Sequence, residues 1–99
     1  MVEQMTGNRV IDPHGDTVGT VTDIFSDDRT MRPQWAVVSY GMFNQHHRVV
    51  PVSRMYESTT DDLCIDLDKD IVRHAPKIGM HEPITAELER ELADYYGRN

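Results

Sequence analysis

The amino-terminal quarter of the chain has the residue pattern of a β-hairpin. Two stretches rich in β-branched residues, Asn8 to Ile11 and Thr17 to Phe25, flank the sequence Asp12-Pro13-His14-Gly15. That sequence has the preferences of a type I turn, with Asp at the first position, Pro at the second and Gly at the fourth. We therefore predict two antiparallel strands joined by this turn.

The second strand of this hairpin has an unusual spacing of apolar residues. Val18, Val21 and Ile24 are three residues apart, and a flat strand cannot keep that spacing on one face. A helix could keep it, but the intervening threonines and Gly19 are poor helix formers. The pattern favours a strand in which Gly19 marks a β-bulge or a sharp coil.

Three further strands are predicted in the middle of the chain. The apolar run from Gln34 to Tyr40 is typical of a strand covered on both faces, and His47 to Val52 returns as its partner. Pro51 cannot donate a ladder hydrogen bond, so it belongs at the end of that strand or on an edge. In the stretch from Leu63 to Leu67, the side chains of Leu63, Ile65 and Leu67 are expected inward and those of Cys64 and Asp66 outward. Five strands joined by turns predict a mainly β fold, a small antiparallel barrel or rolled sheet.

The last third of the chain changes to a helical pattern. Asp68 can cap a short helix from Asp70 to His74, which ends there because a residue before Pro76 avoids the α region. Thr85 can cap a second helix that ends at Gly97. Its apolar residues at helical spacing are Leu88, Leu92 and either Tyr95 or Tyr96. Such a stripe needs a partner surface, most simply the wall of the barrel.

Composition narrows the class of protein. The chain has 99 residues, 10 basic and 17 acidic side chains and a formal charge of -7. It is long enough for one core, and this charge disfavours non-specific binding to nucleic acid. No apolar run approaches the roughly 18 residues of a membrane span, and the amino terminus lacks the pattern of a secretion signal. We therefore expect a cytoplasmic protein. Its single cysteine, Cys64, cannot form an internal disulfide.

Several strings of residues resemble one known family. The segments Gly7-Asn8-Arg9-Val10-Ile11-Asp12 and Gly15 to Asp23 resemble the opening hairpin of PRC-barrel domains. The middle, from Trp35 through Gly41-Met42-Phe43 to Val50-Pro51-Val52, is similar to the family's next hairpin. The tail resembles that of small stand-alone members, with Val72 to Ile78 preceding a final helix that closes on Tyr95-Tyr96-Gly97. The resemblance places the PRC-type barrel at residues 6–68 and a helical extension of the same domain at 69–99.

What the resemblance implies is an interaction module without general catalytic residues. Related domains occur in a ribosome-maturation factor and in the cytoplasmic part of the photosynthetic reaction-centre H subunit. The ribosome factor has a second domain and the reaction-centre subunit has a membrane helix, so neither role transfers directly. An accessory role in ribosome assembly or RNA processing remains an alternative. It would use a basic face built from Arg9, Arg29, Arg32, Arg48 and Arg54.

The chemically active side chains are sparse. His46 and His47 are adjacent in a strand and should point to opposite faces, so they cannot easily share a metal. The acidic run from Asp61 to Asp70 lacks the glycine and terminal glutamate of a calcium loop. Ser39, Ser53 and Ser58 have no Ser-His signature nearby, and Cys64 has no neighbouring base. We therefore predict neither enzyme activity nor a cofactor or metal site. A small-ligand or metal-ion sensor is the third alternative, although a narrow barrel filled by its own side chains leaves little room for a ligand.

The most informative local feature is apolar material at the predicted tip of the second hairpin. Met42 and Phe43 occupy a turn where polar residues are usual, and Trp35, Met31, Met55 and Tyr56 are near in sequence. Together these residues could form an exposed docking patch of the types favoured at interfaces. Alternatively, the tip folds back beneath the carboxyl-terminal helix. The exposed arrangement favours a protein-protein interaction module that forms a homodimer or binds a protein partner whose identity the sequence does not give.

Overall fold

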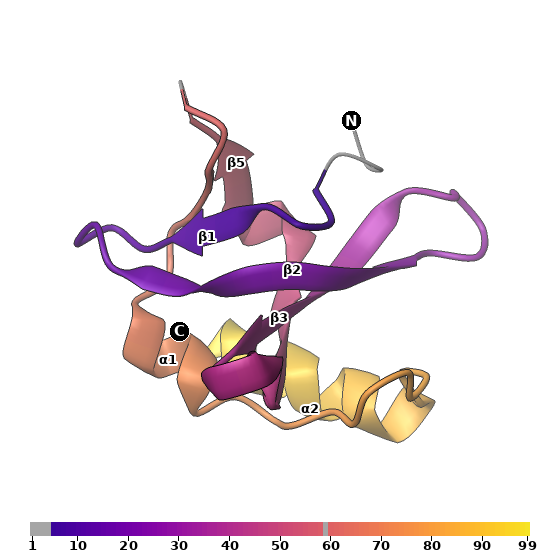
Figure 1. The fold of residues 1–99 in the computed structure, drawn as a ribbon. Coiled ribbons are helices and arrows are strands. Elements are labelled where there is room, and N and C mark those ends of the chain that lie inside the picture. The colour runs from indigo at the N-terminus through magenta and orange to yellow at the C-terminus, as the bar shows by residue number, and fades with distance from the viewer. Residues whose placement is uncertain (1–4, 59) are drawn as a thin grey trace.

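The computed structural model describes residues 5–58 and 60–99. In chain order its elements are β1 (Arg9–Ile11), β2 (Thr17–Ser26), β3 (Pro33–Tyr40), the 3-10 turn η2 (Met42–Asn44), β4 (His46–Pro51), the 3-10 turn η3 (Val52–Arg54), β5 (Met55–Glu57), β6 (Leu63–Ile65), α1 (Lys69–Arg73) and α2 (Ala86–Gly97). The strands form one sheet in the order β4-β3-β2-β1-β6-β5, which curls into a half-barrel. Both helices lie on the same side of the β1–β2 hairpin (Figure 1).

The mainly β class with a carboxyl-terminal helix is confirmed, but the sheet is mixed where an antiparallel one was predicted. The chain leaves β4 at one edge of the sheet, crosses through η3 and forms the hairpin of β5 and β6 at the other edge. That path brings β6 alongside β1 in the same direction, so Val10 pairs with Leu63 in a parallel ladder. The sixth strand, β5, was not predicted because three residues are too few to show a period.

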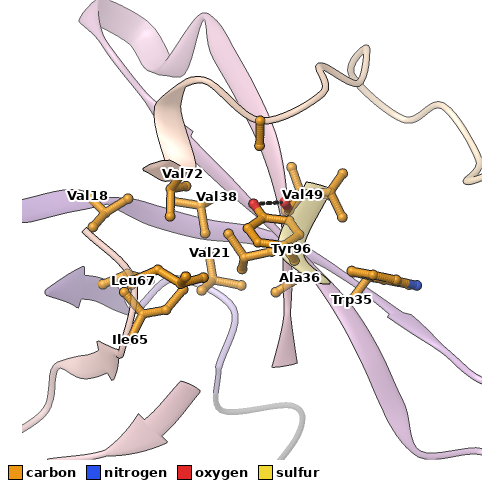
Figure 2. Packing of buried hydrophobic residues seen from close by; sticks show 14 of the residues in the cluster. Val18, Val21, Trp35, Ala36, Val38, Val49, Ile65, Leu67, Val72 and Tyr96 are labelled. Atoms are coloured by element: carbon orange, nitrogen blue, oxygen red, sulfur yellow. Dashed lines mark hydrogen bonds between the residues drawn. The ribbon is translucent and has the colours of Figure 1, made fainter. Parts of the chain in front are cut away.

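The core lies between the concave side of the sheet and the helices. Figure 2 shows side chains from β2, β3, the segment after β6 and α1 converging on Tyr96 of α2. Leu92 and Tyr96 are the buried residues of α2, which confirms the predicted stripe, and the Thr85 hydroxyl accepts the Leu88 amide at 3.1 Å as the predicted cap. The Tyr96 hydroxyl donates to the Val49 carbonyl at 2.5 Å. Burial raises the pKa of Tyr96, so this hydroxyl remains a donor at any ordinary pH.

No helix in the described part of the chain combines the length and the apolar composition needed to cross a membrane.

Two irregularities in β2 explain its three-residue spacing. Val10 pairs with Gly19 whereas Ile11 pairs with Thr17, so the register against β1 shifts beside Gly19, as predicted. A second shift lies between Val21 and Asp23 in the pairing with β3. Each shift advances the strand by one residue, and Val18 and Val21 are therefore both fully buried.

Gly19 also permits the close approach of β2 and β3. A Cβ atom at this position would lie 2.5 Å from the Ser39 carbonyl oxygen and 2.7 Å from Val38 Cγ1. Real Cβ atoms do not come this close to backbone, so any side chain here would push the two strands apart.

We predict that Gly19→Ala lowers the free energy of unfolding by about 1–3 kcal/mol, the usual effect of overpacking a core. The matched control is Gly97→Ala at the end of α2, where a Cβ would meet open space. That variant should be neutral or gain up to about 1 kcal/mol, because alanine favours the helix more than glycine does. Urea unfolding of both variants measures the difference, and equal stabilities would contradict the close-approach argument.

A buried carboxylate connects the first hairpin to the first helix. Asp12 is 5% exposed, and its Oδ1 accepts the amides of His14 and Asp16 at 2.9 Å each within the predicted turn. Its Oδ2 accepts the amide of Lys69 at 3.0 Å, the first residue of α1. Asp68 was predicted to cap this helix. It occupies the N-cap position but makes no capping bond, and its carboxylate instead contacts His14 Nε2 at 3.1 Å.

These contacts shift the pKa of Asp12. Burial by itself raises the pKa of Asp12, but the three backbone amides favour the charged form more strongly, so the pKa is lowered from its usual 3.8. Because the folded pKa lies below the unfolded one, the stabilisation is complete above about pH 4 and is lost as the pH falls through the folded pKa.

We predict that Asp12→Asn lowers stability by about 1–3 kcal/mol at neutral pH. The gap between the variant and the wild type should narrow as the pH falls below about 4, because the protonated wild type loses the same charge. Thermal unfolding over a pH series measures both effects, with Asp61→Asn, a change to an exposed carboxylate in the β5–β6 connection, as the control. A gap that is constant with pH would contradict the role given to the Asp12 charge.

Candidate functional site

The β3–β4 connection presents apolar side chains to solvent. The side chains of Met42 and Phe43 in η2 are 73% and 92% exposed, so the tip does not fold beneath α2. Met80, in the segment that follows α1, is 66% exposed and shares a pocket with Phe43. We call Met42, Phe43 and Met80 the tip patch. Phe43 has a positive φ of 61°, a backbone conformation that bulky residues rarely adopt, and its ring is held outward in this conformation.

A pocket of about 250 Å³ lies beside the tip patch, and we call it the tip pocket. Its walls come from the β2–β3 hairpin, the β3–β4 connection and the segment between Ile78 and Glu82. Apolar walls include Phe25, Phe43 and Met80, whereas Asp23 and Glu82 supply carboxylates. No lysine or arginine lies among the described residues that line it. The pocket therefore suits an apolar group that carries or adjoins a positive charge.

A short chain of hydrogen bonds fixes a histidine of this pocket. His47 Nδ1 lies 2.6 Å from the Ser39 hydroxyl, which lies 2.7 Å from the Thr22 hydroxyl. The sequence has no Ser-His signature near Ser39, and the two residues meet because the register of β3 and β4 pairs Ser39 with His47. Ser39 is fully buried, and the third member of the chain is a threonine instead of a carboxylate. The arrangement orients the His47 ring; a substrate cannot reach the Ser39 hydroxyl.

Trp35, Met55 and Tyr56 of the predicted patch lie elsewhere. Trp35 is only 7% exposed, so its inclusion in an exposed patch is wrong: its strand is covered on both faces, as its apolar run indicated. Met55 is half-buried and packs against the core. Tyr56 is 55% exposed, but it is in β5, at the opposite edge of the sheet from β4. The structure thus keeps Met42 and Phe43 together and separates them from Trp35, Met55 and Tyr56.

The five arginines considered for a basic face are dispersed and mostly engaged. Arg9 forms a two-point contact with Asp62 at 2.9 and 3.2 Å, and this pairing lowers the pKa of the Asp62 carboxyl. Arg54 Nε pairs with Asp66 at 2.6 Å. Arg48 is buried, where its Nε donates to the last carbonyl of α1 and its guanidinium lies beside the Tyr40 ring. Arg29 and Arg32 alone of the five are exposed without a side-chain ion pair among the described residues. This geometry does not favour an RNA-binding face.

Histidines and acids are likewise separated. His46 stacks on Tyr40 with ring centroids 5.0 Å apart, on the opposite face of β4 from His47, as predicted. Across residues 5–58 and 60–99, no group of three or more histidine, cysteine, aspartate or glutamate side chains is arranged to hold a metal ion.

Met80 and Glu82 were not singled out from the sequence, although they complete the tip pocket. The available signal was weak, because Met80 follows Gly79 in a short stretch before Thr85 that shows no regular period. Their position beside the tip depends on the antiparallel bridge between Arg48 and Lys77, which lays this segment along the outer edge of β4. A contact between segments so far apart has no local sequence pattern.

Comparison with known proteins agrees with the fold. No curated protein matches the chain. The model of the PRC-barrel domain family matches residues 2–72, which include every strand of the half-barrel and all of α1 but its last residue. This chain therefore belongs to the PRC-barrel domain family.

Proposed function

We propose that this protein is a non-enzymatic protein-protein interaction module that forms a homodimer through the tip patch. The observation that carries the proposal is Phe43, which is 92% exposed and held in a left-handed backbone conformation. A bulky residue in that conformation costs on the order of 1 kcal/mol, and an exposed phenyl ring gains nothing from the core. A partner that covers the ring removes it from water, and this gain offsets the cost of the backbone conformation.

The surroundings of Phe43 support the same function. Methionine and aromatic residues are enriched at protein interfaces, and Met42 and Met80 flank the ring with flexible side chains that adapt to a partner. The adjoining tip pocket offers a recess beside a protruding side chain. In a dimer with two-fold symmetry, both copies use the same surface. That surface must therefore carry both a protruding side chain and a recess that receives one.

The area that Phe43 buries determines how much it contributes to the free energy of association. Covering one phenylalanine side chain contributes about 1.5–3 kcal/mol, which corresponds to roughly a tenfold to 150-fold change in a dissociation constant.

We predict that Phe43→Asp weakens self-association by at least about tenfold while leaving the fold intact, because the side chain makes little contact with its own chain. Sedimentation equilibrium over a concentration series measures the association, and circular dichroism checks the fold. The matched control is Tyr56→Asp, an exposed aromatic residue at the opposite edge of the sheet, which should leave association unchanged. A wild-type protein that is monomeric at all concentrations, or a Phe43→Asp variant with unaltered association, would overturn the proposal.

A further inference from the structure

The tip patch by itself is too small for a stable dimer. A typical specific interface removes about 800 Å² from each partner, whereas a large aromatic side chain buries only about 150–250 Å². Two methionines and one phenylalanine therefore supply only part of the required area. If the homodimer proposed above forms, a second region of the surface must take part, and it must match the tip pocket.

The β2–β3 turn is a candidate for that region. It comprises residues 27–32 and projects beyond the rest of the sheet (Figure 1). Its outermost apolar residue, Met31, is 77% exposed and has a positive φ of 58°. We call residues 27–32 the hairpin arm.

The hairpin arm is held in one conformation before any partner binds. The Met31 amide donates to the Asp27 carbonyl at 2.8 Å, and the Asp27 amide donates to the Arg32 carbonyl at 2.8 Å. The Asp27 carboxylate accepts the amides of Arg29 and Thr30 at 2.7 and 3.2 Å. These bonds keep Met31 directed away from its own chain, so its insertion into a partner requires little additional ordering.

The arm and the tip pocket are complementary in shape and charge. An apolar cavity of about 150 Å³ suffices to hold benzene, so a pocket of about 250 Å³ has room for a methionine side chain. The pocket carries Asp23 and Glu82, with His47 and His81 but no lysine or arginine among the described residues that line it. On the arm, the Arg32 side chain makes no hydrogen bond or ion pair with any described residue and is available for those carboxylates.

Part of the tip pocket and the hairpin arm belong to the same β2–β3 hairpin, which makes a two-fold arrangement possible. Asp23 and Phe25 of the pocket are in β2, at the base of the arm that carries Met31. Four residues from Phe25 to Arg29 span at most about 13 Å. Two such hairpins placed side by side in opposite directions bring each arm to the base of the other.

We propose that the occupant of the tip pocket is the hairpin arm of a second copy of this chain. Met31 of each copy enters the other's pocket, and Arg32 lies against Asp23 and Glu82. This inference rests on the proposed homodimer and names the surfaces that form it. Phe43 is a wall of the pocket in this arrangement, so one interface includes both the tip patch and the arm.

The test is a reciprocal charge reversal. Arg32→Glu and Glu82→Arg should each weaken dimerisation by at least about fivefold, because each places like charges together across the interface. The double variant restores opposite charges and should recover association to within about threefold of the wild type, as coupled residues do. Asp28 is also exposed on the arm, so a single charge reversal could change association through the net charge of the surface alone. The decisive measurement is therefore whether association recovers in the double variant.

Two further variants separate this inference from the proposed function. Met31→Asp should weaken association about as much as Phe43→Asp, whereas Arg90→Glu, an exposed change on α2, should have no effect. Sedimentation equilibrium measures every variant. If Phe43→Asp weakens the dimer but Met31→Asp does not, or if the double charge variant fails to recover, the dimer stands and the arm contact is overturned. A wild-type protein that stays monomeric overturns both.

Discussion

One buried carboxylate, that of Asp12, joins segments of the fold that are 57 residues apart in the sequence. Asp12 accepts two amides of its own turn and the first amide of α1, and these bonds fix where the chain emerges from β6 relative to β1. The parallel pairing of β1 and β6 lies next to this contact and closes one side of the half-barrel. Because an aspartate can satisfy these amides only when it is charged and correctly placed, the contact specifies topology as well as stability.

Closing the sheet in this way determines which surfaces remain available. The concave side is filled by valines, by Ile65 and Leu67, and by Tyr96 from α2 (Figure 2). The sheet stays open between β4 and β5, and the segment after α1 covers part of the β4 edge. The described non-glycine residues with left-handed backbones are all exposed, and they are Met31, Phe43, Asn44 and His81. Three of them line the tip pocket and the fourth is the end of the hairpin arm.

Local sequence patterns were sufficient for most of the fold and for half of the site. The Asp12 to Gly15 turn, the irregular β2, the edge position of Pro51 and the Thr85 cap were predicted because each depends on a few neighbouring residues with defined conformational preferences. Met42 and Phe43 were found because apolar residues in a turn are unusual. Trp35 was misplaced because nearness in sequence was taken for nearness in space, although the continuous apolar run of its own strand argued against exposure.

The sequence by itself determined five of the six strands, the first turn, the two helices and the family, because propensity, period and turn chemistry act over a few residues. Only the tertiary structure decided the parallel β1–β6 pairing, the capping of α1 by Asp12 instead of Asp68, the contact of Ser39 with His47 and the pocket between Phe43 and Glu82. Each of these joins segments that come together only when the whole sheet has curled. The free energy that selects them comes from shared burial and from buried polar groups finding partners, and neither leaves a period in the chain.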